Sequence, residues 1–313
     1  MPIRSRRPLP KLFSMTKRIS GLVAAPFTPF HSDGSLWLDQ IAPYARHLAR
    51  HAVSGAFVCG TTGEGASLTL EERKRVAERW KAEAPAGLKV IVHVGGNCMA
   101  DCRELARHAQ EIGADAVAAI APHFFRPANL DELVAWCGGL AAAAPELPFY
   151  YYHMPAMSGV NFEMAQFLPR AAERISNFGG IKFTHENLMD YALTVAAAAG
   201  RFDVLFGRDE ILLSALALGA TGAVGSTYNY AAPLYQRMMA AHEQGDRAAA
   251  LAAQLESARL IQAFVKHGGM AANKAIMRLI GVDCGPVRPP LSRTSPDEEA
   301  ALKRDLERLG WLI

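Results

Sequence analysis

Eight short apolar segments recur along the chain, each separated from the next by a longer stretch with the periodicity of a helix. The apolar segments are almost free of polar residues, as parallel strands are when both faces of the sheet are buried. They cover residues 21–27, 55–60, 89–95, 116–120, 148–153, 178–183, 202–207 and 222–226. This alternation of strand and helix predicts an α/β fold built on a parallel sheet.

The stretches between these segments have the length and spacing of helices. Residues 38–52, 70–84 and 100–114 place aliphatic side chains at i, i+3 and i+4 positions. Thr69 marks a helix start, because its hydroxyl can cap the first turn. Eight such units favour a closed (β/α)8 TIM barrel. An open doubly wound sheet fits less well, since no G-x-G-x-x-G phosphate turn follows the first segment.

The strand pattern stops near residue 230, which sets the predicted domain boundary. We assign residues 19–230 to the barrel and residues 231–313 to a C-terminal helical extension packed on it. Helical periodicity covers residues 232–280 and 296–309, with the Pro-rich segment GPVRPPL between them. The extension is not expected to act as a separate domain.

Residues 1–18 carry six basic side chains and no acidic one. Such a leader can be a transit peptide, but it shows no amphipathic apolar face, so we expect a disordered tail. No secretory segment and no uncharged membrane-spanning run is present, so we expect a cytoplasmic protein without a membrane partner. The net charge of +3 is small and dispersed, which argues against a nucleic-acid partner.

Lys182 is the most informative single residue, because it lies near the end of the apolar segment FGGIKF. Burying an ammonium group without a partner is costly, so the group either pairs or loses its proton. A desolvated lysine is a free amine near neutral pH, as imine formation requires. The alternative is a lysine that reaches the rim of the barrel or pairs with an acid.

Two further segments could carry chemistry. The segment FYYYHMPAMSGV places Tyr150 and Tyr152 on one side of a strand and Tyr151 on the other, and a tyrosine at a strand's carboxyl end can move protons. The loop CGTTGEGASLT offers hydroxyl and backbone N–H groups to a small anion such as a carboxylate. Packing of aromatic rings and a plain strand-to-helix turn are the alternatives.

The histidines and two arginines beside prolines give no clear indication of a functional site. The ten histidines have no metal-ligand spacing, so a metal site is not expected. Arg126 and Arg288 each precede a proline and are interpreted as surface turns.

Taken together, these segments resemble the dihydrodipicolinate synthase/N-acetylneuraminate lyase family of pyruvate-dependent class I aldolases. The resemblance covers about residues 20–290 and keeps the family's order and spacing. It is carried by GTTGE (60–64), YHMPAMSG (152–159), GIKFT (180–184), FGRDE (206–210) and GATGAVGSTYNY (219–230). It implies a TIM-barrel enzyme that acts on a keto acid, forms a homotetramer and needs no metal or organic cofactor.

The resemblance also implies roles for individual residues. Lys182 would form the imine, and Tyr152 would transfer protons. The pyruvate carboxylate would be held by Thr61 and Thr62. The hydroxyl groups of a sugar substrate would be bound by Thr184, Gly207, Asp209, Glu210 and Ser226.

Within the family, the lyase branch is the better match, which implies cleavage of N-acetylneuraminate to pyruvate and N-acetylmannosamine. Met157 stands where the synthase branch has an arginine for its second substrate, which argues against synthase activity. Phe124 stands where many members supply a tyrosine to the neighbouring subunit, which puts that proton relay in doubt. Arg208 is unusual in the sugar-binding segment: it either points to solvent or favours a more acidic or shorter sugar acid.

Two alternatives remain open from the sequence. The chain could be another pyruvate-dependent aldolase or dehydratase that acts on a different keto sugar acid, because the chemistry at C2 is shared. It could also be a barrel that senses pyruvate without catalysis, although the intact set of Lys182, Tyr152, Thr61 and Thr62 argues against this.

Overall fold

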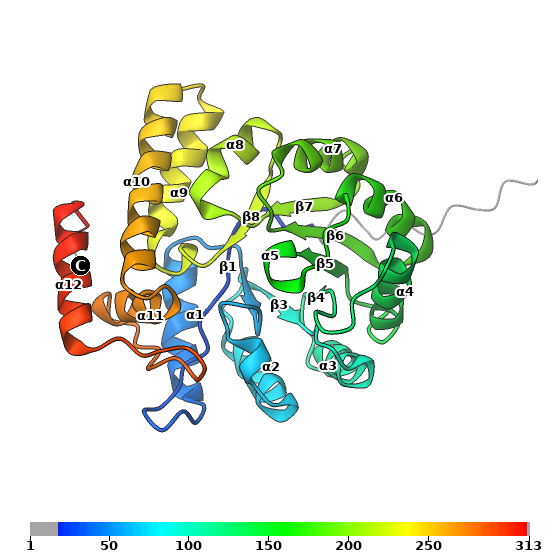
Figure 1. Ribbon diagram of the computed structural model, residues 1–313, viewed down its shortest axis with the longest axis horizontal. Helices are drawn as coiled ribbons and strands as arrows, with labels where there is room; N and C mark the ends of the chain where they lie inside the picture. The colour runs from blue at the N-terminus through cyan, green and yellow to red at the C-terminus, as the bar shows by residue number, and fades with distance from the viewer. Residues whose placement is uncertain (1–17, 312–313) are drawn as a thin grey trace, which may run out of the picture.

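The computed structural model describes residues 18–311 and contains a closed barrel of eight parallel strands in sequential order (Figure 1). Strand β8 pairs with β1 and closes the ring. The strands are β1 (Gly21–Ala24), β2 (Gly55–Val58), β3 (Lys89–His93), β4 (Ala116–Ile120), β5 (Phe149–His153), β6 (Phe178–Phe183), β7 (Asp203–Phe206) and β8 (Gly222–Gly225). Each strand lies within one of the eight apolar segments, so the predicted (β/α)8 barrel is confirmed.

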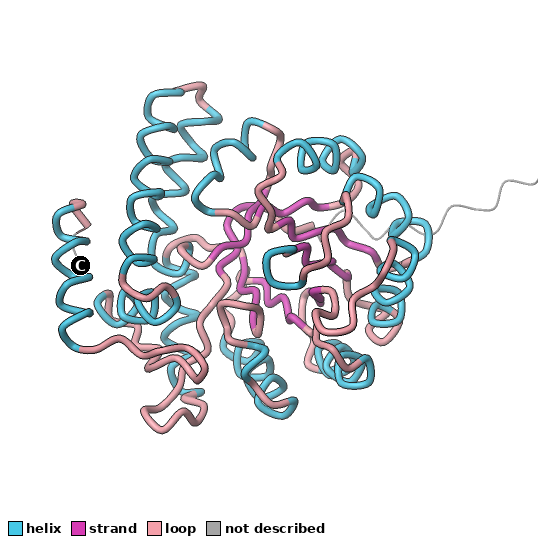
Figure 2. Tube along the Cα trace, viewed as in Figure 1, coloured by secondary structure: helices cyan, strands magenta, loops and turns pink. Residues whose placement is uncertain are grey.

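Helices surround the ring of strands (Figure 2). They are α1 (Ile41–Arg50), α2 (Leu70–Glu83), α3 (Met99–Glu111), α4 (Leu130–Ala141), α5 (Pro155–Ser158), α6 (Met164–Arg174), α7 (Leu188–Ala198), α8 (Leu212–Ala217) and α9 (Tyr228–Glu243). The predicted start of α2 is confirmed. The Thr69 hydroxyl accepts a hydrogen bond from the Glu72 N–H, and the Glu72 carboxylate accepts one from the Thr69 N–H.

The C-terminal extension consists of α10 (Arg247–Lys266), α11 (Met270–Leu279) and α12 (Pro296–Arg308), with α10 lying along α9 (Figure 1). Helix α9 follows β8 and packs on β1, so it occupies the place of the eighth barrel helix. The predicted boundary at residue 230 therefore falls inside α9. The strand pattern ends at β8, but the helix that completes the eighth unit comes after it.

The first described residues, Arg18 and Ile19, are hydrogen-bonded to Asp203 at the start of β7. Residues 1–17 of the predicted tail lie outside the described residues. Arg18, which the prediction included in the tail, donates to Asp203 Oδ1 at 2.9 Å. Asp203 Oδ2 also accepts hydrogen bonds from the Ile19 N–H and the Tyr150 hydroxyl.

No helix between residues 18 and 311 is long and apolar enough to cross a membrane.

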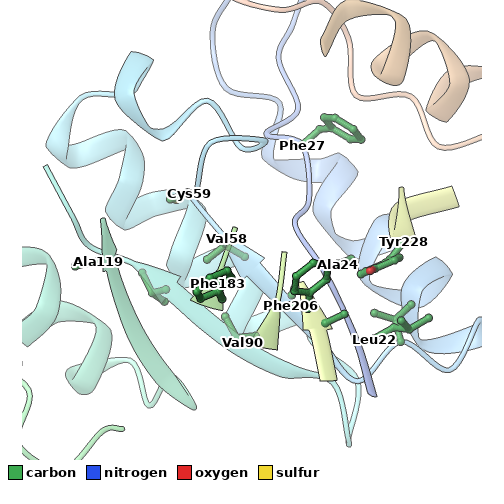
Figure 3. Close-up of a cluster of buried hydrophobic side chains, with 14 of the residues drawn as sticks. Leu22, Ala24, Phe27, Val58, Cys59, Val90, Ala119, Phe183, Phe206 and Tyr228 are labelled. Atoms are coloured by element: carbon green, nitrogen blue, oxygen red, sulfur yellow. The ribbon is translucent and has the colours of Figure 1, made fainter. Parts of the chain in front are cut away.

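Alternation along the strands separates two apolar cores. The outer core fills the space between strands and helices, and Figure 3 shows part of it, including Leu22, Val58, Val90, Phe183 and Phe206. The inner core fills the barrel and includes Val23, Phe57, Ile91, Tyr150 and Tyr152. Tyr151 belongs to the outer core, as the alternation predicts. Residues that face the barrel interior are therefore the ones that can reach a site at its mouth.

The capping box at Thr69 yields a stability prediction. Thr69→Ala removes the hydroxyl that satisfies the Glu72 N–H, so we expect a loss of about 1 kcal/mol in the free energy of unfolding. Thr69→Ser keeps the hydroxyl and should stay close to the wild type. Urea unfolding followed by circular dichroism measures both. Equal midpoints for Thr69→Ala and the wild type would contradict a stabilising cap.

Candidate active site

A cavity of about 260 Å³ lies at the carboxyl ends of the barrel strands. Active sites of TIM barrels are built at this end, from residues that follow several different strands. All nine residues predicted from the sequence line the cavity: Thr61, Thr62, Tyr152, Lys182, Thr184, Gly207, Asp209, Glu210 and Ser226. The barrel thus brings together Tyr152 of β5 and Lys182 of β6 with residues that follow β2, β6, β7 and β8.

Lys182 is buried in the barrel mouth, with 4% of its surface exposed. Its Nζ atom lies 4.0 Å from the centre of the Phe57 ring and 3.9 Å from the centre of the Tyr152 ring. Within residues 18–311 its side chain makes no ion pair and no hydrogen bond. Lys182 is therefore desolvated without being paired, which excludes the alternative of a lysine held by a carboxylate.

Burial lowers the pKa of Lys182 to about 7, and the charge of Asp209 opposes that shift. An ammonium group in an apolar site is destabilised relative to the neutral amine. At a pKa near 7, roughly half of the amines are neutral at neutral pH, against fewer than about one in a thousand for an unperturbed lysine. The side chain is thus available as a nucleophile.

Tyr152 lies beside Lys182 because the two residues are register partners on β5 and β6. Its hydroxyl is 3.4 Å from Thr61 Oγ1 and donates to the sulfur of Met154 at 2.8 Å. Burial raises the pKa of Tyr152 to about 12, while the neighbouring Thr61 and Thr184 hydroxyls act in the opposite direction. The phenol is therefore neutral at pH 7 and suited to pass a proton on rather than to hold a negative charge.

Two buried oxygens on the β6 and β7 side of the cavity have no hydrogen-bond partner. They are Thr184 Oγ1 and Asp209 Oδ1. Asp209 Oδ2, in contrast, accepts hydrogen bonds from both the N–H and the hydroxyl of Thr227. Gly207 allows the close approach here, because a Cβ at that position would lie 1.9 Å from Thr184 Oγ1. Unpartnered polar atoms are costly to bury, so this wall is suited to bind ligand hydroxyl groups.

Arg208 lies at the edge of the cavity between two acids. Its guanidinium pairs with Glu186 and, at 3.0 Å, with Glu210 Oε1. It lines the cavity and is paired with both acids, so it does not simply point to solvent, which was the first of the two possibilities that the sequence left open. The contact instead holds the carboxylate of Glu210.

Sequence reasoning missed the part of the wall that comes from the extension. Ile261, Phe264 and Val265 of α10 line the cavity. Gln254 of the same helix donates to the Glu210 carbonyl at 2.9 Å and accepts from the Leu213 N–H. The periodicity of α10 shows a helix but not the surface it faces, so no sequence signal identified these residues.

Phe124 and Met157 lie outside the cavity and are 76% and 60% exposed. In the described part of the chain, no cluster of three or more His, Cys, Asp or Glu residues could hold a metal ion. The cavity itself presents an amine, a phenol, hydroxyl groups and carboxylates. These groups suit imine chemistry on a small polar keto acid.

Comparison with known proteins gives a consistent result. A family model described as the dihydrodipicolinate synthetase family matches residues 18–309. N-acetylneuraminate lyase of Mus musculus is 44% identical over 301 residues, which cover 95% of this chain and 94% of the mouse protein.

Two solved structures agree with this comparison. Proteus mirabilis N-acetylneuraminate lyase has a TM-score of 0.91 and 41% identity, covering 94% of this chain and 100% of that one. Native N-acetylneuraminate lyase from Aliivibrio salmonicida has a TM-score of 0.91 and 42% identity, covering 95% and 98%. The chain belongs to the dihydrodipicolinate synthetase family.

Proposed function

We propose that the protein is a class I aldolase that cleaves N-acetylneuraminate to pyruvate and N-acetylmannosamine. The observation that carries the proposal is the buried, unpaired amine of Lys182 in a cavity rich in hydroxyl-binding groups. The similarity to N-acetylneuraminate lyases along nearly the whole chain supports the choice of substrate.

The reaction begins when the neutral amine of Lys182 attacks the C2 carbonyl of the open-chain keto acid. Loss of water gives a protonated imine, which withdraws electrons from the neighbouring carbon atoms. The substrate carboxylate is held by Thr61 and Thr62, whose loop follows β2 and borders Tyr152. The aromatic rings of Phe57 and Tyr152 keep water away from the nitrogen.

Cleavage follows when Tyr152 accepts the proton of the C4 hydroxyl. The C3–C4 bond breaks, its electrons move to the imine nitrogen, and the sugar leaves as an aldehyde. The remaining enamine is protonated at C3, and hydrolysis of the imine releases pyruvate and restores the free amine. Because the pKa of Tyr152 is about 12, its hydroxyl gives up its own proton to a partner as it accepts another. The Thr61 hydroxyl, 3.4 Å away, is in position to take that proton while it passes its own to the substrate carboxylate. The proton returns along the same path through Tyr152 when C3 of the enamine is protonated.

The sugar part would satisfy the unpartnered oxygens of Thr184 and Asp209, and Glu210 and Ser226 would complete the polar wall with the backbone at Gly207. A polyol chain offers hydroxyl groups that can donate to each oxygen. Met157 in place of an arginine leaves the synthase reaction without a partner for a second carboxylate, which further supports cleavage of a sugar acid.

We also place the enzyme in the cytoplasm as a homotetramer. Phe124 and Phe125 support assembly, because they form an exposed edge-to-face aromatic pair on the loop after β4. Exposed apolar side chains of this size are typical of contact surfaces between subunits. Phe124 cannot donate a proton to a neighbouring site, so each subunit would rely on its own Tyr152.

The activity can be tested with a panel of keto sugar acids by measuring pyruvate release. We expect rapid turnover of N-acetylneuraminate and none with Lys182→Ala, because the imine cannot form. Borohydride reduction with pyruvate should add covalent mass to Lys182 in the wild type alone. Turnover of a deoxy-keto-hexonate without turnover of N-acetylneuraminate would reassign the substrate. No mass gain would indicate a sensor without imine chemistry.

The pH dependence of kcat/KM follows from the pKa of Lys182. Below pH 7 the amine is protonated, so kcat/KM should rise about tenfold per pH unit and level off above about pH 7. Asp209→Asn removes the charge that opposes the shift, so its rising limb should move to lower pH. A limb that continues to rise towards pH 10 would show an unperturbed lysine.

A further inference from the structure

A second lysine is buried in this protein, and its surroundings differ from those of Lys182. Lys274 of α11 lies 2.7 Å from Glu64 Oε1, and both side chains are only 1% exposed. Its Nζ also donates hydrogen bonds to the carbonyl oxygens of Thr28 and Pro286, at 2.9 and 2.8 Å. Lys274 thus has an ion pair and two hydrogen bonds, whereas Lys182 contacts two aromatic rings and has no ion pair or hydrogen bond within residues 18–311.

Glu64 connects this ion pair to the loop that carries Thr61 and Thr62. The Glu64 N–H donates to the Thr61 carbonyl at 3.0 Å, which closes a tight turn over the two threonines. Glu64 has a φ of 53°, a left-handed conformation that a residue with a side chain holds only when its surroundings fix it. The following Gly65 packs so closely that a Cβ would lie 2.0 Å from the Cys59 carbonyl oxygen.

Arg288 reinforces the same connection, contrary to its interpretation as a surface turn. Its N–H donates to Glu64 Oε2 at 2.8 Å. Its guanidinium donates to both carboxylate oxygens of Glu72 and to the carbonyls of Ser67 and Gly34. The extension therefore contacts the loop at Glu64, beyond it at Ser67, and at the start of α2.

The pair acts at a distance from the substrate. Glu64 and Lys274 do not line the active-site cavity, while Thr61 and Thr62, a few residues away, do. A buried carboxylate and ammonium fix each other's position, because separating them would leave two buried charges without a counterion. A displaced Glu64 would carry the Thr61 carbonyl with it through the turn.

We propose that Glu64 and Lys274 are positioning residues, which fix the Thr61–Thr62 loop in the place where it binds the keto-acid carboxylate. The C-terminal extension is then part of the binding machinery through α11, in addition to the wall formed by α10. This inference rests on the proposed function only in assigning the carboxylate to the two threonines.

The test uses pyruvate alone, with covalent capture by borohydride as the readout. We expect Glu64→Gln and Lys274→Met to raise the pyruvate concentration for half-maximal labelling about 10- to 100-fold, since small misplacements of a binding group have effects of this size. In both variants the labelling rate should still rise with pH and level off near pH 7, as in the wild type, because neither residue touches Lys182.

The double variant Glu64→Gln/Lys274→Met separates positioning from stability. It leaves no uncompensated buried charge, so it should unfold at a higher temperature than Lys274→Met, yet still bind pyruvate weakly. Arg278→Gln is the matched control. Arg278 lies one turn further along α11 and pairs with Glu299 at the surface, so this variant should label like the wild type.

The positioning role would be overturned if the Glu64→Gln and double variants fold and reach half-maximal labelling at the same pyruvate concentration as the wild type. So would failure of both to fold, which would make the pair a stability element alone. A wild type that captures pyruvate but does not cleave N-acetylneuraminate refutes the assigned substrate and leaves this proposal standing. A wild type that captures no pyruvate removes both.

Discussion

The site depends on a lysine amine that the fold buries without giving it a counterion. Phe57 and Tyr152 border the Lys182 nitrogen with aromatic rings, and burial outweighs the attraction of the Asp209 charge. Lys274 shows the other outcome for a buried lysine, because Glu64 and two backbone carbonyls surround its charge. The two buried lysines thus differ in their partners: within residues 18–311 Lys182 has neither an ion pair nor a hydrogen bond, whereas Lys274 has both.

The closed barrel explains how this arrangement can be combined with recognition of a polar substrate. Adjacent parallel strands place Tyr152 next to Lys182 by register, and the strand ends carry the Thr61–Thr62 loop and the segment with Asp209 and Glu210 to the same mouth. The extension then adds an apolar wall from α10 and a buried ion pair from α11. The extension therefore contacts both the cavity and the loop that carries Thr61 and Thr62.

The sequence predicted the strands and the cavity residues well, because both leave local signals. Buried parallel strands appear as continuous apolar runs, and a lysine inside one of them, as in FGGIKF, conflicts with its surroundings. Contacts between distant segments left no such signal. Arg288 looked like a turn because its partner Glu72 is far away in the chain, and the barrel boundary was drawn where strands ended rather than after α9.

The most direct test of the account is a titration of the Lys182 amine itself. Protein labelled with ¹³C and ¹⁵N at lysine, compared with a Lys182→Arg variant, assigns the Nζ signal by its disappearance. The account predicts that this signal titrates near pH 7, because burial destabilises the ammonium form. A Lys182 signal that titrates near the ordinary lysine value of 10.5 would show a solvated or paired amine, and the proposed imine chemistry would lose its physical basis.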